Sequence, residues 1–129
     1  MYKKLIVNYK DKRGKIVDIF VSNPKDHCTL VTFNKGSVRG NHFHKNTCQY
    51  TFVIMGKLLL ISQKINREGQ LIGNPKKKIL SENSIVVHKQ NHAHAFKALK
   101  KSKILAFADG KRGGKNYDID TYILNVPLI

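Results

Sequence analysis

The chain has 129 residues, of which 41% are hydrophobic, and this fraction excludes a chain that is disordered throughout. No apolar run approaches the ~18 residues of a membrane helix, and Leu5 to Val7 is too short for the core of a signal peptide, so we expect a cytoplasmic protein without a membrane partner. The formal charge of +16 points to an anionic partner, but no basic helix or aromatic-rich basic strand favours nucleic acid.

In chain order, the pattern predicts a series of short strands. The first are two strands around a turn at Asp11 to Gly14, then 27–33, then 35–44, then 49–65 with a bend at Gly56. They are followed by a turn-rich hairpin region over 66–78, a strand, tight turn and strand over 84–99, and closing strands within 102–110 and 118–126. No convincing helix of ten residues is present. We therefore predict an all-β fold, a sandwich or barrel, in one domain over 1–129.

The strand that begins at Gln49 has apolar side chains on both faces. Residues 49, 51, 53 and 55 share one face, and Tyr50, Phe52 and Ile54 share the other. A strand that is apolar on both sides is covered on both sides. One face would look into the protein, and the other needs a neighbouring sheet or a second subunit, which favours a homodimer.

Two cysteines, Cys28 and Cys48, lie in apolar surroundings and form no Cys-x-x-Cys pair. We expect free thiols in a reducing compartment rather than a disulfide.

The most informative motif is a pair of histidines, His42 and His44, on a predicted strand. Alternate residues of a strand point to the same side, so both imidazoles should face one space. Gly36 precedes His42 by six positions, Gln49 follows His44 by five, and Gly56 closes the motif. This spacing resembles the first motif of the cupin superfamily, in which metal-binding members have Glu where this chain has Gln49. The resemblance implies a double-stranded β-helix, a jelly-roll barrel.

The resemblance narrows to the nucleotide-sugar branch of the cupins. The run Arg-Gly-x-His-x-His-Lys at 39–45, with Gln49 four residues later, is most similar to dTDP-4-keto-6-deoxyglucose 3,4-ketoisomerases. The dTDP-4-dehydrorhamnose 3,5-epimerases are more distantly similar, since they carry glutamine in place of the second histidine. The resemblance implies a dTDP-sugar or other nucleotide diphosphate sugar as ligand, a role in glycan or polysaccharide biosynthesis, and a homodimer.

The chemistry explains why histidines suit such a reaction. A 4-keto sugar has an acidic C3 proton, and its removal and return need a group that titrates near neutral pH. The resemblance makes His42 and His44 catalytic. It makes substrate-binding candidates of Arg39 as a phosphate ligand and of Gln49, His94, Tyr50 and Tyr117, with Tyr122 as a further tyrosine that could assist. The sequence leaves open whether the product is a 3-keto sugar or a C3/C5 epimer.

Two other functions stay open. His42, His44 and His94 supply three imidazoles, the number found in many divalent transition-metal sites, although Gln49 removes the anionic fourth ligand. We expect no cofactor, with such a metal as the alternative. A non-catalytic sugar-binding protein is the third reading. The other histidines receive no catalytic role: His27 is placed in a loop, and His88 and His92 at the surface or in a turn.

Overall fold

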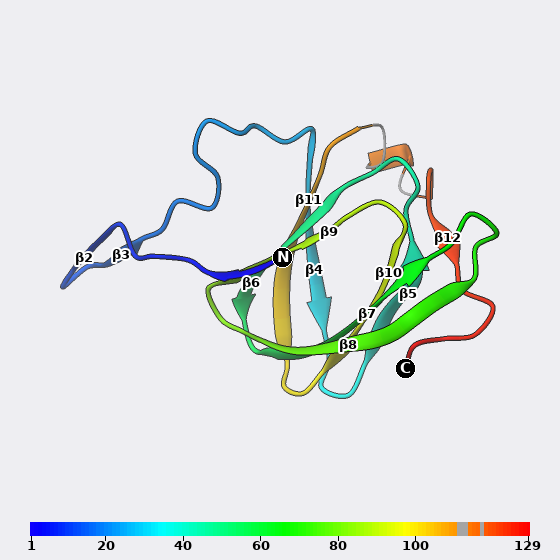
Figure 1. Ribbon diagram of the computed structural model, residues 1–129. Coiled ribbons are helices and arrows are strands. Elements are labelled where there is room, and N and C mark those ends of the chain that lie inside the picture. Colours follow the sequence, from blue (N-terminus) through cyan, green and yellow to red (C-terminus); the bar gives the residue numbers. More distant parts are fainter. Residues whose placement is uncertain (111–113, 117) are drawn as a thin grey trace.

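The computed structural model describes residues 1–110, 114–116 and 118–129. Two antiparallel five-stranded sheets form the body of the molecule (Figure 1). The first sheet contains, in spatial order, β1 (Tyr2–Lys4), β9 (Ser84–His88), β6 (Gln49–Met55), β11 (Ser102–Ala108) and β4 (His27–Phe33). The second contains β12 (Tyr122–Ile123), β5 (Val38–Phe43), β10 (His92–Ala98), β7 (Lys57–Ile65) and β8 (Leu71–Ser81). The predicted all-β jelly-roll is confirmed.

Helical structure among the described residues is limited to one 3₁₀ turn, Gly114–Asn116. Within that part of the chain we find no helix with the length and apolar character needed to cross a membrane. Both cysteines are free thiols, Cys28 exposed and Cys48 half-buried, as predicted.

The interior between the sheets is apolar at one end and polar at the other. At the apolar end, Val53 and Ile104 of the first sheet pack with Leu58 and Phe96 of the second in one buried cluster. Along β6, the buried inward side chains change from polar to apolar. Gln49 and Thr51 come first, and Val53 follows. Gln49 pairs with His88 of β9, which brings the polar ends of these two strands together. The strands thus supply a hydrophobic base and a polar site above it.

A second apolar cluster fixes the strand that carries the histidines. It contains Phe43, Ile65, Ala93 and Leu124, so the C-terminal segment folds back onto β5, β7 and β10. Asn41 anchors this segment, because its backbone and side-chain carbonyl groups accept the backbone N–H groups of Leu124 and Leu128. β5 is therefore held along the stretch that ends in His42 and Phe43.

The prediction for 66–78 was wrong in part. The turn is confined to residues 66–70, and β8 follows as an eleven-residue strand paired with β7. β8 is an edge strand, where a proline costs no ladder hydrogen bond on its open side, and the register shifts between Ser62 and Lys64 opposite Gly73 and Pro75. Pro75 and Lys76 to Lys78 suggest a loop by composition, but at a sheet edge their side chains stay in solvent.

The N-terminal segment leaves the body of the molecule. After β1, two three-residue strands, β2 (Tyr9–Asp11) and β3 (Gly14–Ile16), form a hairpin around the predicted turn. Figure 1 shows this hairpin standing away from the two sheets, at the far left of the view. The chain returns to the body through Phe20 and Lys25 before β4 begins.

Candidate active site

A cavity of about 330 Å³ opens at the polar end of the interior. His42, Gln49 and His94 line one part of it, and Val31, Phe33, Phe96 and Ile104 line an apolar part. Its described charged lining residues are Arg39 and Asp118. The volume lies within the range of small-molecule pockets, which commonly combine apolar walls with a few converging polar groups.

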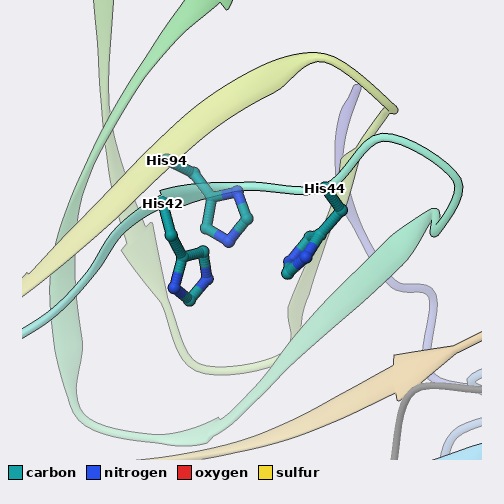
Figure 2. Close-up of side chains that lie close together, drawn as sticks. All are labelled: His42, His44 and His94. Carbon is teal, nitrogen blue, oxygen red and sulfur yellow. The ribbon is translucent and has the colours of Figure 1, made fainter. Parts of the chain in front are cut away.

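Three histidines converge at this cavity (Figure 2). His42 of β5 lies directly opposite His94 of β10 in the sheet, and their ring centroids are 4.8 Å apart. The ring of His44, just beyond β5, lies 4.9 Å from that of His42 and 5.4 Å from that of His94. His42 is half-buried and lines the cavity, whereas His44 is 1% exposed. The predicted convergence of these side chains is correct, and His42 is the one of the motif pair that the cavity reaches.

Asp120 holds His44 in place. The Nδ1 atom of His44 lies 2.8 Å from the backbone carbonyl oxygen of Asp120, and a carbonyl can only accept, so Nδ1 carries a proton. The Asp120 carboxylate accepts the backbone N–H groups of Lys45 and Asn46 at 2.9 and 2.8 Å. Burial raises the pKa of Asp120, but hydrogen bonds from Thr47, Asn46 and Lys45 outweigh it and leave that pKa below its usual value. Asp120 therefore stays ionised and keeps the turn after β5 closed.

A buried chain of polar groups runs on from His44. Its Nε2 atom lies 3.2 Å from Oε1 of Gln49, Nε2 of Gln49 donates to Oγ1 of Thr51 at 3.3 Å, and that hydroxyl lies 3.1 Å from Nε2 of His88. With Nδ1 already protonated, His44 can donate to the Gln49 oxygen only as an imidazolium. A neutral ring instead needs the amide turned round, so that its NH₂ group donates. Gln49 can thus serve both charge states of His44, which a carboxylate at this position could not.

His88 corrects the sequence-based prediction. It is 4% exposed rather than at the surface, and its ring stacks on that of His94 with 4.2 Å between centroids. Burial, assisted by the charge of His44, lowers the pKa of His88 to about 3. Ser84, Val86 and His88 share the inward face of β9.

The ring nitrogens of His94 are buried without hydrogen-bond partners in the described part of the chain. The side chain is 1% exposed. Burial, followed by the nearby charge of His88, lowers its pKa well below the usual value. A buried imidazole in this state is neutral at neutral pH and offers an unused lone pair toward the cavity.

The remaining predicted residues lie in different places. Arg39 is exposed and lines the cavity, its Nε atom donates to the carbonyl oxygen of Thr32 at 3.2 Å, and its guanidinium lies 5.5 Å from the ring centre of Phe33. Tyr50 points to the opposite face of β6, where Lys25 Nζ lies 3.9 Å from its ring centre. The structure therefore does not bring Tyr50 to the cavity.

Tyr122 does not line the described cavity either. Tyr122 stacks on Phe43 at 5.3 Å, and Tyr117 lies outside the described residues. His92 is partly exposed and its Nδ1 atom contacts the carbonyl oxygen of Gln90 at 3.1 Å, but it begins β10 rather than lying in the turn before it.

Sequence reasoning missed two ionisable lining residues, His27 and Asp118. His27 begins β4 instead of lying in a loop, lines the cavity, and donates from Nε2 to the carbonyl oxygen of Gly110 at 2.9 Å. The alternation of β4 contains the signal, since His27, Thr29, Val31 and Phe33 all line the cavity. Asp118 lies in the segment before β12, for which no periodic pattern gives an orientation.

This architecture is known from other proteins. A family model described as the polysaccharide biosynthesis C-terminal domain matches residues 9–122. No curated protein sequence matches the chain significantly. The three-dimensional structure, however, resembles many solved structures.

Two of these are bacterial or archaeal epimerases. The dTDP-4-dehydrorhamnose 3,5-epimerase from Sulfolobus tokodaii is 23% identical, with a TM-score of 0.72, over 83% of this chain and 68% of that one. The dTDP-6-deoxy-D-glucose-3,5-epimerase RmlC from Legionella pneumophila, in complex with dTDP-4-keto-L-rhamnose, is 17% identical, with a TM-score of 0.72, over 85% and 66% of the two chains. This chain thus spans about two thirds of the length of these epimerases.

A third similar structure is the capsular polysaccharide assembling protein CapF from Staphylococcus aureus. It is 17% identical, with a TM-score of 0.66, and the match covers 95% of this chain but 34% of CapF. At these identities the shared property is the fold.

Proposed function

The chain belongs to the polysaccharide biosynthesis C-terminal domain family, and we propose that it is a sugar-nucleotide isomerase or epimerase. Its reaction would move a proton at the carbon beside the keto group of a nucleotide-linked 4-keto-6-deoxyhexose. The observation that carries this proposal is His42, a half-buried imidazole in the wall of a cavity of about 330 Å³. Histidine exchanges protons near neutral pH, and an apolar cavity keeps competing water away from an enediolate.

The proposed mechanism begins at C3 of the sugar. His42 removes the C3 proton, and the electron pair of the broken C–H bond forms the C3–C4 double bond of an enediolate with the negative charge on O4. Returning a proton to C3 from the opposite side gives an epimer. Returning it to C4, while the O3 proton passes by way of the base to O4, gives the 3-keto isomer with a hydroxyl group at C4. Both reactions therefore share their first step and its base.

His44 supports this step from beside the base. It is 1% exposed and engaged with Asp120 and Gln49, so we assign it to setting the charge around His42. The Gln49 amide can follow a change in the charge of His44 without leaving an unsatisfied buried group.

Three observations support a nucleotide diphosphate sugar as the ligand. Arg39 stands exposed at the cavity, where a guanidinium can hold phosphate oxygens, and the chain carries a charge of +16. The similar Legionella pneumophila epimerase was solved with dTDP-4-keto-L-rhamnose. The His-x-His motif favours the 3,4-ketoisomerases, whereas the two epimerases compared above are 3,5-epimerases. A homodimer and a cytoplasmic location remain predictions.

The test is to incubate the protein with dTDP-4-keto-6-deoxyglucose in D₂O and follow the sugar signals by proton NMR. We expect deuterium at C3 at a rate proportional to enzyme concentration, followed by signals of a 3-keto sugar or an epimer. Failure to exchange C3, with no binding of the substrate or of dTDP at millimolar concentration, would contradict the proposal. UDP-linked and dTDP-linked substrates compared in one experiment then identify the nucleotide.

A second candidate function, divalent-metal binding, has its own supporting observation. Three ring nitrogens, one each from His42, His44 and His94, lie within 4.8 Å of one another. Both nitrogens of His94 lack a hydrogen-bond partner within the described part of the chain. Three imidazoles fit a transition metal, which would supply Lewis-acid polarisation of a keto oxygen. His42 and His94 would bind it directly, and His44 would have to exchange its contact with Gln49 for the ion.

Elemental analysis of protein purified without a His-tag decides between the two candidates. Stoichiometric metal that is lost in His94→Ala, together with C3 exchange that is abolished by chelator and restored by one metal, would favour the second. Exchange that survives complete removal of metal would favour the first.

A further inference from the structure

The cavity that His42 lines is polar in one row of the second sheet and largely apolar in the next. His42 pairs with His94 across β5 and β10, and Arg39 pairs with Phe96 in the neighbouring inward row. Successive inward residues of one strand lie about 6–7 Å apart. This separation is close to the width of one pyranose ring, so a single sugar can contact both rows.

A bulge in β5 turns Arg39 toward the cavity. Three positions separate Arg39 from His42, and simple alternation would put them on opposite faces of the strand. The register shifts at this point, where Gly40 has φ +97° and Asn41 has φ +55°. A Cβ on Gly40 would lie 2.7 Å from the carbonyl oxygen of His94, so a side chain there would push the two strands apart. The bulge therefore puts a guanidinium in the same wall as the proposed base.

The first sheet supplies the facing wall of the cavity. On β11, Ala106 and Ala108 line it, and their small side chains leave space between the sheets. Ile104 is the next inward residue of the same strand, and it pairs with Val31 of β4. The facing wall thus changes from small to bulky apolar side chains along β11.

Two phenylalanine rings complete the apolar part of the cavity. Phe33 and Phe96 meet edge to face, with 6.3 Å between their centroids, and both are at most 3% exposed. We call Val31, Phe33, Phe96 and Ile104 the apolar end. None of these four side chains can form a conventional hydrogen bond. A hydroxyl group placed among them would lose its water without gaining a side-chain partner, which is unfavourable.

We propose that the apolar end binds the C6 methyl group of the sugar and thereby selects 6-deoxyhexoses, an inference that rests on the proposed function. In a hexopyranose, C3 lies across the ring from the ring oxygen, and C1 and C5 flank that oxygen. With C3 at His42, the phosphate on C1 and the C6 group on C5 both point away from the base. Arg39 then takes the phosphate, and the apolar end takes the methyl group.

The opposite placement of these two substituents is unfavourable. A phosphate at the apolar end would be a buried charge without a partner, and a methyl group at the exposed Arg39 would gain little burial. The apolar end therefore fixes which way the ring lies, and it distinguishes a C6 methyl group from a C6 hydroxymethyl group.

The first test compares two ligands that differ only by the C6 hydroxyl group, dTDP-6-deoxyglucose and dTDP-glucose. Isothermal titration calorimetry should show that the 6-deoxy ligand binds about 10- to 100-fold more tightly, the usual range for a hydroxyl group in an apolar pocket. Equal dissociation constants, with C3 exchange of the 4-keto sugar intact, would overturn this proposal and leave the proposed function standing. Failure of both ligands to bind at millimolar concentration would overturn it too, and with absent C3 exchange would also contradict the proposed function.

The second test adds a hydroxyl group to the protein instead of the ligand. Val31→Thr keeps the shape of a half-buried side chain, and Ile104→Thr makes a similar change deeper in the cavity, with circular dichroism to check its fold. Each should reduce the preference for the 6-deoxy ligand by about threefold or more. Val126→Thr is the matched control, because Val126 is 69% exposed and does not line the cavity. A preference that stays at the wild-type value in both cavity variants would overturn the assignment of the apolar end.

Discussion

His88 stacks on His94 inside the protein, with 4.2 Å between ring centroids and 29° between ring planes. Both side chains are at most 4% exposed. Two imidazoles this close cannot both be charged without a large cost, and burial opposes the charge on either one. The folded state therefore holds both rings neutral, and acid works against folding at this point of the structure.

The first prediction is that stability falls as the pH is lowered below about 6.5. The pKa of His88 is lowered from 6.5 to about 3 in the folded protein, so between these values the unfolded chain binds a proton that the folded chain refuses. Each such histidine should lower the free energy of unfolding by about 1.4 kcal/mol per pH unit. Urea unfolding of chelator-treated protein at pH 7, 6 and 5 measures this slope.

The variant His88→Leu should make that slope shallower by the contribution of one group. His92→Asn is the control, because His92 is partly exposed and outside the buried stack. A pH dependence that is identical in wild type and His88→Leu would show that His88 is not held neutral by burial.

The second prediction compares two glycines of the motif. Gly56 has φ +98°, and a Cβ there would lie 2.6 Å from Cα of Ser102 and 2.5 Å from the carbonyl oxygen of Lys101. Gly36 has φ +84° but open space around the same position. Gly36→Ala should therefore lower the free energy of unfolding by about 1–2 kcal/mol, because alanine is strained in the left-handed backbone conformation. Gly56→Ala should cost clearly more, because the backbone of residues 101 and 102 must also move.

Denaturant unfolding at pH 7 measures the loss of unfolding free energy in Gly36→Ala and in Gly56→Ala. Equal losses in the two variants would mean that the neighbouring chain relaxes freely around Gly56, contrary to the close packing described here.

The sequence predicted the motif strands better than the side-chain orientations outside them. β4 and β6 begin and end close to their predicted bounds, and the bend at Gly56 is where the spacing placed it. His42 and His44 lie on one side of the chain by alternation, and they meet His94 because β10, which carries His94, pairs with β5. For β9, both faces carry apolar residues, so composition did not say which face turns inward and His88 was placed outside.

Other features depend on tertiary context that a single sequence does not display. Alternation alone separates Tyr50 from Gln49, but that Gln49 is the inward one and that Tyr50 meets Lys25 and Phe20 are tertiary facts. Asp120 and His44 are 76 positions apart, and nothing in either local pattern pairs them. β8 forms because β7 pairs with it on both sides of the register shift, in spite of the glycine, proline and lysines that suggest a loop.

The third prediction concerns Arg39, which is exposed at the cavity and contacts the chain through the carbonyl oxygen of Thr32. If it holds phosphate oxygens of the nucleotide, Arg39→Ala should raise KM by about tenfold or more and change kcat little, since the phosphate contact is the same in ground and transition states. Arg67→Ala is the matched control on the turn before β8. Steady-state kinetics with the substrate identified by NMR would refute this role if kcat fell while KM stayed constant.

The most direct test of the account is C3 deuterium exchange in His42→Asn. Asparagine keeps a polar group of similar reach but cannot take a proton near neutral pH. The exchange rate at C3 of a nucleotide-linked 4-keto-6-deoxy sugar should therefore drop by ~10²–10⁴ relative to wild type, while the affinity for the nucleotide stays within a few fold. Undiminished C3 exchange in His42→Asn, with substrate bound as in wild type, would contradict the assignment of His42 as the base.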